Sequence, residues 1–270
     1  MKPVALLARA LLVTLPIACG GSVVSTPAEP SVPLIGDWSC VAGLAAGGLT
    51  AELQRVMPLP PASASFTAFT AHFRDAASMA DVPAVDVSAC QVLDETCASP
   101  LAEAQADEYG LVTLAVPGGL PSFDGYLQVS TPGMPTNLVF LPGRSPGFGS
   151  TALQVDLYTS SAIALAATRA GVTLHPALGV VHVDALDCNG TAAEDVVVAI
   201  STGDSAAVTA YATGDGISRE ASGTDATGVA FAFGVAGGPV GIRATLEGVP
   251  VGGALGVARA GAVTSLVVKP

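Results

Sequence analysis

Alternation of large apolar residues with small or polar ones is the main structural signal along this chain. Residues 229–235 and 240–246 both show it, with the period of two that is typical of a strand with one buried face. A break that contains Gly237, Gly238 and Pro239 separates the two runs. Two such runs joined by a short Gly-containing loop predict a β-hairpin.

A polar turn introduces this predicted hairpin and recurs earlier in the chain. Asp225 and Gly228 occupy the positions where a type I turn favours an Asp-type residue early and a Gly late. Asp107 and Gly110 repeat the pair, again ahead of an apolar run, a break and a second run. This internal repeat indicates two related β domains.

Further runs of the same kind predict additional strands. We expect strands at residues 66–73, 84–90, 179–184, 196–200, 206–212, 254–259 and 263–269. In the first of these, the face that carries Phe69 and Phe73 should lie in the core, and His72 should lie on the more exposed face.

One segment predicts a helix. Residues 159–171 are rich in Ala, and Ser160 or Ser161 can cap the start of the helix. Arg169 lies in the last predicted turn, and Gly171 can end the helix.

Composition agrees with an all-β protein. The chain has 50% hydrophobic, 12% charged and 5% aromatic residues, with 31 Gly and 20 Pro, which suits short strands and turns. We predict two small antiparallel β-sandwich domains, transthyretin-like or Ig-like, at residues 36–149 and 175–270. A linker at 150–174 contains the short helix. Residues 19–35 are rich in Gly, Ser, Thr and Pro and should form a flexible tether.

The first residues predict export. Residues 1–18 combine the positive charges of Lys2 and Arg9 with an apolar stretch that is too short to span a bilayer. The stretch ends at Cys19, followed by Gly20, and resembles a bacterial lipoprotein signal, in which the Cys becomes the lipidated first residue. The resemblance implies lipidation of Cys19 and sorting to the outer membrane. The alternative is ordinary secretion, with Cys19 in a discarded or frayed N-terminus.

Four cysteines remain if Cys19 carries lipid, and three pairings are then possible. Cys90 and Cys97 flank a polar loop, so a local disulfide is our first prediction. Metal ligation is the competing interpretation, but the spacing of this pair matches no common zinc site. Cys40 and Cys188 then either bridge the two domains or stay as buried free thiols.

The second predicted domain resembles a known family. The resemblance rests on residues 179–181, the turn at 187–190, residues 196–198, and the turn at 224–228 with the paired runs after it. These segments resemble the carboxypeptidase regulatory-like family across residues 175–270, and residues 80–142 resemble it more weakly. The resemblance implies a transthyretin-like, Ig-like β-sandwich and an accessory module without catalytic residues.

Charge excludes two classes of partner. The chain has a formal net charge of -12, and its ten Lys and Arg residues are scattered along the sequence. Nucleic acid and anionic membrane surfaces both need a concentrated basic patch. We therefore predict no nucleic-acid partner, and membrane contact only through the N-terminal lipid.

The sequence pattern of a serine hydrolase motif is present, but it lacks a backbone group that the motif requires. Gly143, Ser145 and Gly147 match the nucleophile elbow of serine hydrolases. The residue after the Ser must supply a backbone N–H to the oxyanion hole, and here it is Pro146, which has none. We therefore predict no catalytic residue at this position.

Two groups of possible metal ligands have simpler explanations. His182 and Asp184 lie two apart on a predicted strand and would share a face, and we interpret them as a solvent-facing polar pair. Asp204, Asp215 and Asp225 lie in Gly-rich loops but lack the alternating spacing of a calcium loop. We predict no metal site and no cofactor.

These observations predict a non-enzymatic structural or protein-interaction module of the cell envelope, whose partner is an envelope protein or a glycan. The alternative is a carbohydrate- or small-ligand-binding surface lipoprotein, which would need Tyr109, Tyr126 and Tyr158 around one cleft. A hydrolase, the third possibility, would need a Ser within hydrogen-bond reach of a His.

Overall fold

The computed structural model describes residues 36–41, 66–92, 94–117, 125–141, 152–202 and 207–270. Within these ranges the chain forms fifteen strands and one helix, so the predicted all-β class is confirmed. The first seven strands are β1 (Phe66–Asp75), β2 (Asp86–Gln91), β3 (Ala102–Gln105), β4 (Leu111–Pro117), β5 (Gly125–Ser130), β6 (Asn137–Phe140) and β7 (Leu153–Leu157). After helix α1 (Ser160–Arg169) come β8 (Gly179–Ala185), β9 (Val196–Ser201), β10 (Val208–Thr213), β11 (Gly216–Ser218), β12 (Val229–Val235), β13 (Gly238–Leu246), β14 (Val249–Ala258) and β15 (Val263–Val268).

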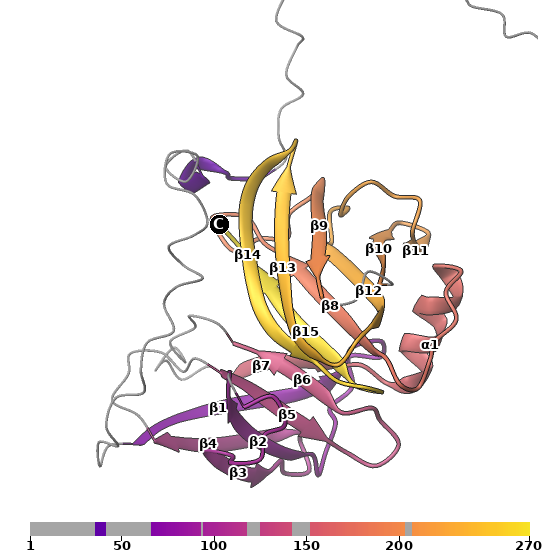
Figure 1. Cartoon of the computed structure of the whole chain (residues 1–270). Helices are drawn as coiled ribbons and strands as arrows, with labels where there is room; N and C mark the ends of the chain where they lie inside the picture. Colours follow the sequence, from indigo (N-terminus) through magenta and orange to yellow (C-terminus); the bar gives the residue numbers. More distant parts are fainter. Residues whose placement is uncertain (1–35, 42–65, 93, 118–124, 142–151, 203–206) are drawn as a thin grey trace, which may run out of the picture. The chain divides into compact units, whose positions relative to one another are not determined.

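The strands form three sheets (Figure 1). A nine-stranded sheet, called here the long sheet, has the order β11-β10-β12-β8-β15-β6-β5-β2-β3, and two three-stranded sheets have the orders β4-β1-β7 and β14-β13-β9. Most neighbouring strands are antiparallel, and three pairs are parallel, namely β1 with β7, β15 with β6 and β15 with β8.

The first hydrophobic core lies between the long sheet and the β14-β13-β9 sheet. Val181 and Leu266 of the long sheet are fully buried and cluster with Val198 of β9 and Ile242 of β13. Side chains that alternate along each strand supply this layer, as in other sandwiches. The two layers of this sandwich alternate along the chain, because β8 is followed by β9, β12 by β13, and β14 by β15, each pair split between the two sheets.

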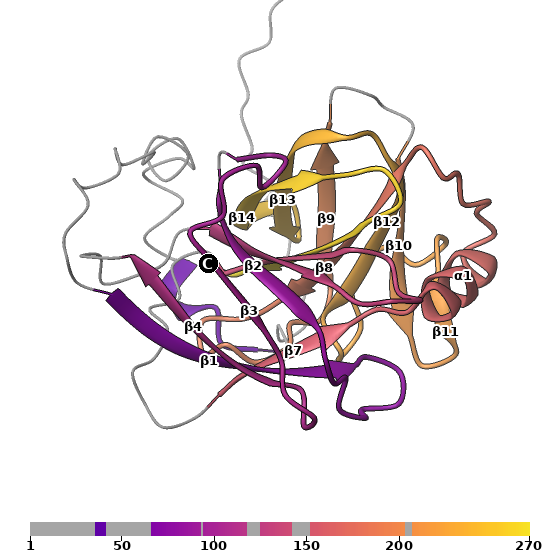
Figure 2. The same ribbon diagram turned by 90° about the horizontal axis from the view of Figure 1, so that it is seen from below.

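The second core lies between the long sheet and the β4-β1-β7 sheet, whose strands lie side by side in Figure 2. Phe69 and Phe73 of β1 are buried in it, which confirms the predicted core face of this strand. Strand β6 contributes to both cores, because Leu138 lies in the first cluster and Val139 in the second. The long sheet is therefore covered on both faces at β6.

Helix α1 covers another part of the long sheet. Ile163 and Ala167 pack against Phe231 and Phe233 of β12, on the face opposite the first core. The predicted helix is confirmed, but its cap is Thr159, whose Oγ1 accepts a hydrogen bond from the Ala162 N–H at 3.1 Å. Thr159 can cap the helix because its backbone is extended just before the first turn.

The predicted hairpin at residues 229–246 is wrong, because its two strands belong to different sheets. Strand β12 pairs with β8 and β10, whereas β13 pairs with β14 and β9. Both faces of β12 are buried, Ala232 toward the first core and Phe231 toward α1, and both of its edges are paired. Gly238, at a φ of 126°, lies where the chain passes from one sheet to the other.

The division into domains at 36–149 and 175–270 stays a prediction. Residues 34–270 cluster as one compact unit, and the β6–β15 pairing joins strands from the two predicted domains in one sheet.

Candidate functional site

The turn residues predicted from the repeat form two matching turns. The Gly110 N–H donates to the Asp107 carbonyl at 3.1 Å, and the Gly228 N–H donates to the Asp225 carbonyl at 2.8 Å. Both glycines have a positive φ, 73° and 70°, in the left-handed region that glycine adopts most readily. In each turn the Asp carboxylate also accepts from the backbone N–H two residues later, at 2.9 Å.

Each turn packs onto the end of a neighbouring strand. A Cβ added at Gly110 would lie 2.7 Å from the Phe73 carbonyl oxygen, and one added at Gly228 would lie 2.5 Å from the Ala185 carbonyl oxygen. The glycine carbonyls in turn accept from the N–H groups of the same two residues, at 2.9 and 2.8 Å. These contacts give the turns a structural role in positioning β4 and β12.

The first of two disulfides fastens the segment 36–41 to the turn after β8. Cys40 and Cys188 are bonded, with 5.9 Å between their Cα atoms and 148 positions between them in sequence. The Asp37 N–H donates to Asp187 Oδ2 at 2.9 Å, and the Cys188 N–H donates to the Asp37 carbonyl at 2.9 Å. Hydrogen bonds from the backbone N–H groups of Asp37 and Thr191 hold the pKa of Asp187 below its usual value. The bridging alternative for Cys40 and Cys188 is the one that the structure contains.

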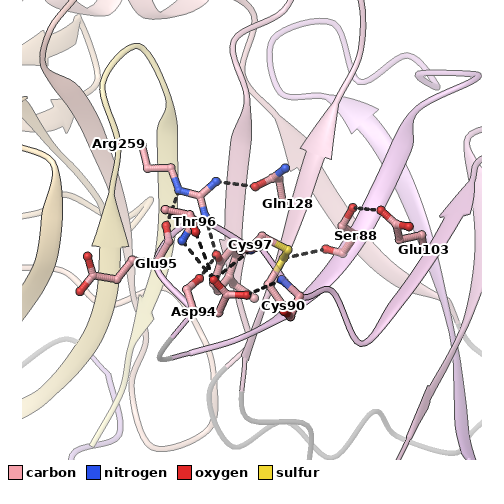
Figure 3. The surroundings of a disulfide bond; sticks show 12 residues. Ser88, Cys90, Asp94, Glu95, Thr96, Cys97, Glu103, Gln128 and Arg259 are labelled. Carbon is pink, nitrogen blue, oxygen red and sulfur yellow. Dashed lines mark hydrogen bonds between the residues drawn. A yellow bond between two sulfur atoms is a disulfide. The ribbon is translucent and has the colours of Figure 1, made fainter.

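The second disulfide, Cys90–Cys97, confirms the predicted local bridge and closes a loop at residues 90–97, called here the disulfide loop (Figure 3). Within it the Asp94 carboxylate accepts from the backbone N–H groups of Ala98 and Ser99, at 3.0 and 2.9 Å. These bonds lower the pKa of Asp94. A cavity of about 360 Å³ borders the loop and is lined by Gln91, Asp94, Ala98 and Ser99.

Arg259 clamps the disulfide loop to the rest of the protein (Figure 3). Its guanidinium donates to the Glu95 carbonyl at 2.6 Å, to Gln128 Oε1 and to the Tyr126 hydroxyl, and its Cζ lies 5.5 Å from the centre of the Tyr126 ring. The Tyr126 hydroxyl donates to the Asp94 carbonyl. Burial raises the pKa of Tyr126, so the phenol stays protonated and keeps this donor. These contacts join the disulfide loop to β5 and to Arg259, the residue that follows β14.

Strand β9, an edge of the three-stranded sheet, has much of its outer backbone satisfied by side chains. The Tyr211 hydroxyl accepts from the Val198 N–H at 3.1 Å and donates to the Val198 carbonyl at 3.4 Å. Thr224 does the same for Val196, through its Oγ1 and its backbone N–H, both at 3.0 Å. Since an added strand would need these groups, β9 is protected against edge-to-edge pairing.

His182 and Asp184 do not form the solvent-facing pair that the sequence predicts. His182 is 4% exposed, and its ring packs against the rings of Tyr158 and Phe231, with centroids 4.7 and 5.1 Å away. Its Nε2 is 3.5 Å from Asp184 Oδ1, and Asp184 remains partly exposed. The prediction failed because α1 and Tyr158 cover this face of the long sheet, which sequence alternation alone does not reveal.

Ser265 lies beside His182 on the neighbouring strand, so a Ser, a His and an Asp meet on one face. The Ser265 hydroxyl and both ring nitrogens of His182 are nevertheless buried, without hydrogen-bond partners among the described residues. A nucleophile needs a hydrogen bond to its base and an open approach for substrate. Neither condition is met by this group.

The other candidate residues from the sequence do not gather at one site. Tyr126 is fully buried in the first core, Tyr158 packs on the cluster around α1, and Tyr109 is 59% exposed. These three rings therefore do not line one cleft. Ser145, Asp204 and Cys19 lie outside the described residues, and within the described part no group of three or more His, Cys, Asp or Glu could hold a metal ion.

Sequence reasoning missed several contacts. His72 forms a 2.8 Å pair with Asp81, and Arg74 forms a 2.9 Å ion pair with Asp156 on the neighbouring strand. The Arg259 clamp joins residues 164 positions apart, and no local signal marks it. The disulfide loop, in contrast, could be predicted from its short Cys spacing.

Comparison with known proteins yields no family. No family model matches the chain, and no curated protein matches it. The carboxypeptidase regulatory-like resemblance therefore gains no support, although the β-sandwich that it implies is present. Within the described residues, no helix is both long and apolar enough to cross a membrane.

Solved structures give distant matches. The shaft pilin SpaA of Lactobacillus rhamnosus GG is 13% identical over 76% of this chain and 98% of its own, with a TM-score of 0.24. The streptococcal ancillary pilin is 11% identical over 75% and 68%, with a TM-score of 0.23. The Bacillus anthracis TIE protein is 11% identical, with a TM-score of 0.24, and the match spans 76% of this chain but only 34% of that protein. These similarities assign no function to the chain.

Proposed function

We propose that this protein is an exported, lipid-anchored, non-enzymatic module of the cell envelope that acts by protein contact. The observation that carries the proposal is the pair of disulfides, Cys40–Cys188 and Cys90–Cys97. Structural disulfides persist in oxidising compartments and are rare in the cytosol. They agree with the export signal predicted at residues 1–18.

The anchor and the tether complete the proposal. Lipidation of Cys19 would hold the N-terminus at the outer membrane, and residues 19–35 would separate the sandwich from the lipid surface. For residues 175–270 we propose an accessory role, which is what their sequence resemblance to the carboxypeptidase regulatory-like family implies.

The disulfide loop supports the contact role. Its polar groups are fixed before a partner arrives, by the Cys90–Cys97 bond, the Asp94 carboxylate and Arg259. Preorganisation of this kind lowers the entropy cost of association. The proposed partner is an envelope protein, and a glycan is the other possibility.

Intact mass of the membrane-extracted protein tests the anchor. We expect a chain that begins at Cys19 and carries acyl groups, and a Cys19→Ser variant that loses both the acyl mass and the membrane fraction. A mass gain on reduction that corresponds to two disulfides would confirm the compartment. An unacylated mass would overturn the anchor, and no gain on reduction would overturn the argument from the disulfides.

Photo-cross-linking in cells tests the contact role separately. A photoreactive residue at Thr96, in the disulfide loop, should capture an envelope protein. The same residue at Leu255, exposed on β14, is the matched control. Equal capture from both positions, or none from Thr96, would contradict a role for the loop.

A further inference from the structure

A groove lies where the end of α1 meets the segment after β11. It is lined by Arg169, Ala170, Gly171, Ser218, Arg219 and Glu220, and its volume is about 330 Å³. None of these residues belongs to the predicted sites or to the disulfide loop. We propose that this groove binds the oxyanion group of a small ligand, namely a phosphate or a sulfate.

The two arginines lack partners within the described chain. Arg74 is paired with Asp156, and the Arg259 guanidinium is occupied by three acceptors. Among the described residues, in contrast, no hydrogen bond or ion pair engages the guanidinium of Arg169 or Arg219. A guanidinium has five N–H donors in a planar fork, which matches two oxygens of a tetrahedral anion.

The Arg169 side chain packs against the backbone of Gly216. A Cβ added at Gly216 would lie 2.7 Å from Arg169 Nη1 and 2.9 Å from its Cδ, so the side chain lies directly over the Gly216 backbone. Gly216 has a φ of 130°, a conformation that L side chains rarely adopt. The glycine thus leaves room for the Arg169 side chain, which contributes to the lining of the groove.

Two further groups define what the ligand must carry. The Ser218 Oγ accepts from the Glu220 N–H at 3.1 Å, so its own proton can be donated to an anion oxygen. Glu220 lines the same groove, and its negative charge repels an anion, although its carboxylate can accept a hydrogen bond from a hydroxyl elsewhere in the ligand. The chain has a net charge of -12 and the groove lies at the C-terminal end of α1, so only the short-range charges of the two arginines favour an anion here.

Titration with inorganic phosphate and with sulfate, followed by the arginine side-chain N–H signals in NMR at constant ionic strength, tests the proposal. We expect saturable shifts for Arg169 and Arg219, and about tenfold weaker binding in Arg169→Gln and in Arg219→Gln. Arg243→Gln is the matched control, because Arg243 is exposed on β13 and lines no part of the groove. Its affinity should equal that of the unchanged protein.

Glu220→Gln gives a test of opposite sign, because removing the repelling charge should tighten binding. Equal affinities in all four variants would show nonspecific anion association and overturn the proposal. The absence of saturable shifts would also overturn it. All four side chains are exposed, so we expect the four variants to fold like the unchanged protein. Neither result depends on the lipid anchor or on the disulfide loop.

Discussion

Removal of the long disulfide should destabilise the protein more than removal of the short one. The perturbation is Cys40→Ala with Cys188→Ala, compared with Cys90→Ala with Cys97→Ala. A disulfide stabilises mainly by restricting the unfolded chain, and the restriction grows with the length of the closed loop. The two bridges close loops of very different size, with sequence separations of 148 and 7.

The chain-entropy relation sets the magnitudes. It gives about 5 kcal/mol for a separation of 148 and about 2 kcal/mol for a separation of 7. Cys90 is fully buried, so its loss also leaves a small cavity that costs about 1 kcal/mol. Cys40 is exposed and leaves none. The expected gap between the two double variants is therefore about 2 kcal/mol.

The hydrogen bonds around Asp187 reduce the gap without removing it. Asp37 stays bonded to Asp187 and to the Cys188 N–H after the disulfide is removed, so part of the segment 36–41 remains attached. Urea unfolding followed by circular dichroism, with the slopes compared between variants, measures the difference. Equal losses, or a larger loss from the Cys90–Cys97 variant, would refute the loop-entropy reasoning for this protein.

Three further predictions concern single side chains. His182→Phe should stabilise the protein by about 1–2 kcal/mol, because an apolar ring replaces a buried imidazole that has no hydrogen bonds among its aromatic neighbours. His72→Phe should not stabilise it, because His72 is paired with Asp81. Thermal unfolding measures both variants. Tyr211→Phe should cost about 1–3 kcal/mol and promote self-association, seen by sedimentation, because it strips both hydrogen bonds from Val198 at the β9 edge. The pKa of Asp187 is lowered in the folded state, so its contribution to stability is present above its ordinary value of 3.8 and is lost as the pH falls through the folded pKa. Asp187→Asn should therefore flatten the loss of stability in acid, measured by urea unfolding across the acid range.

Each of these three has an outcome that contradicts it. A destabilised His182→Phe variant would show that the imidazole is satisfied in solution. A Tyr211→Phe variant that stays monomeric at unchanged stability would show that the β9 edge needs no protection. An Asp187→Asn variant with an unchanged acid transition would place the acid sensitivity elsewhere.

Local features of the fold could be predicted from the sequence. The buried face of β1 follows from a period of two, and the Asp107 and Asp225 turns follow from local hydrogen bonding by their own carboxylates. The Cys90–Cys97 bond joins residues only seven apart, so proximity along the chain was sufficient. These features depend on contacts within a few residues.

Features that depend on which strands meet could not be predicted. An alternating run shows that β12 and β13 are strands, but not that they enter different sheets. The burial of His182 depends on α1 and Tyr158, which approach from another part of the chain. The Arg259 clamp and the Tyr211 contact likewise depend on tertiary proximity.

Strand β15 has a consequence for the order of folding. It lies between β8 and β6 in the middle of the long sheet, yet it follows both of them in the sequence. During synthesis the long sheet cannot be completed until residues 263–268 have left the ribosome, because the pairings of β15 with β8 and with β6 both require them. For a protein proposed to be exported, the long sheet thus stays incomplete while the residues before β15 are being synthesised.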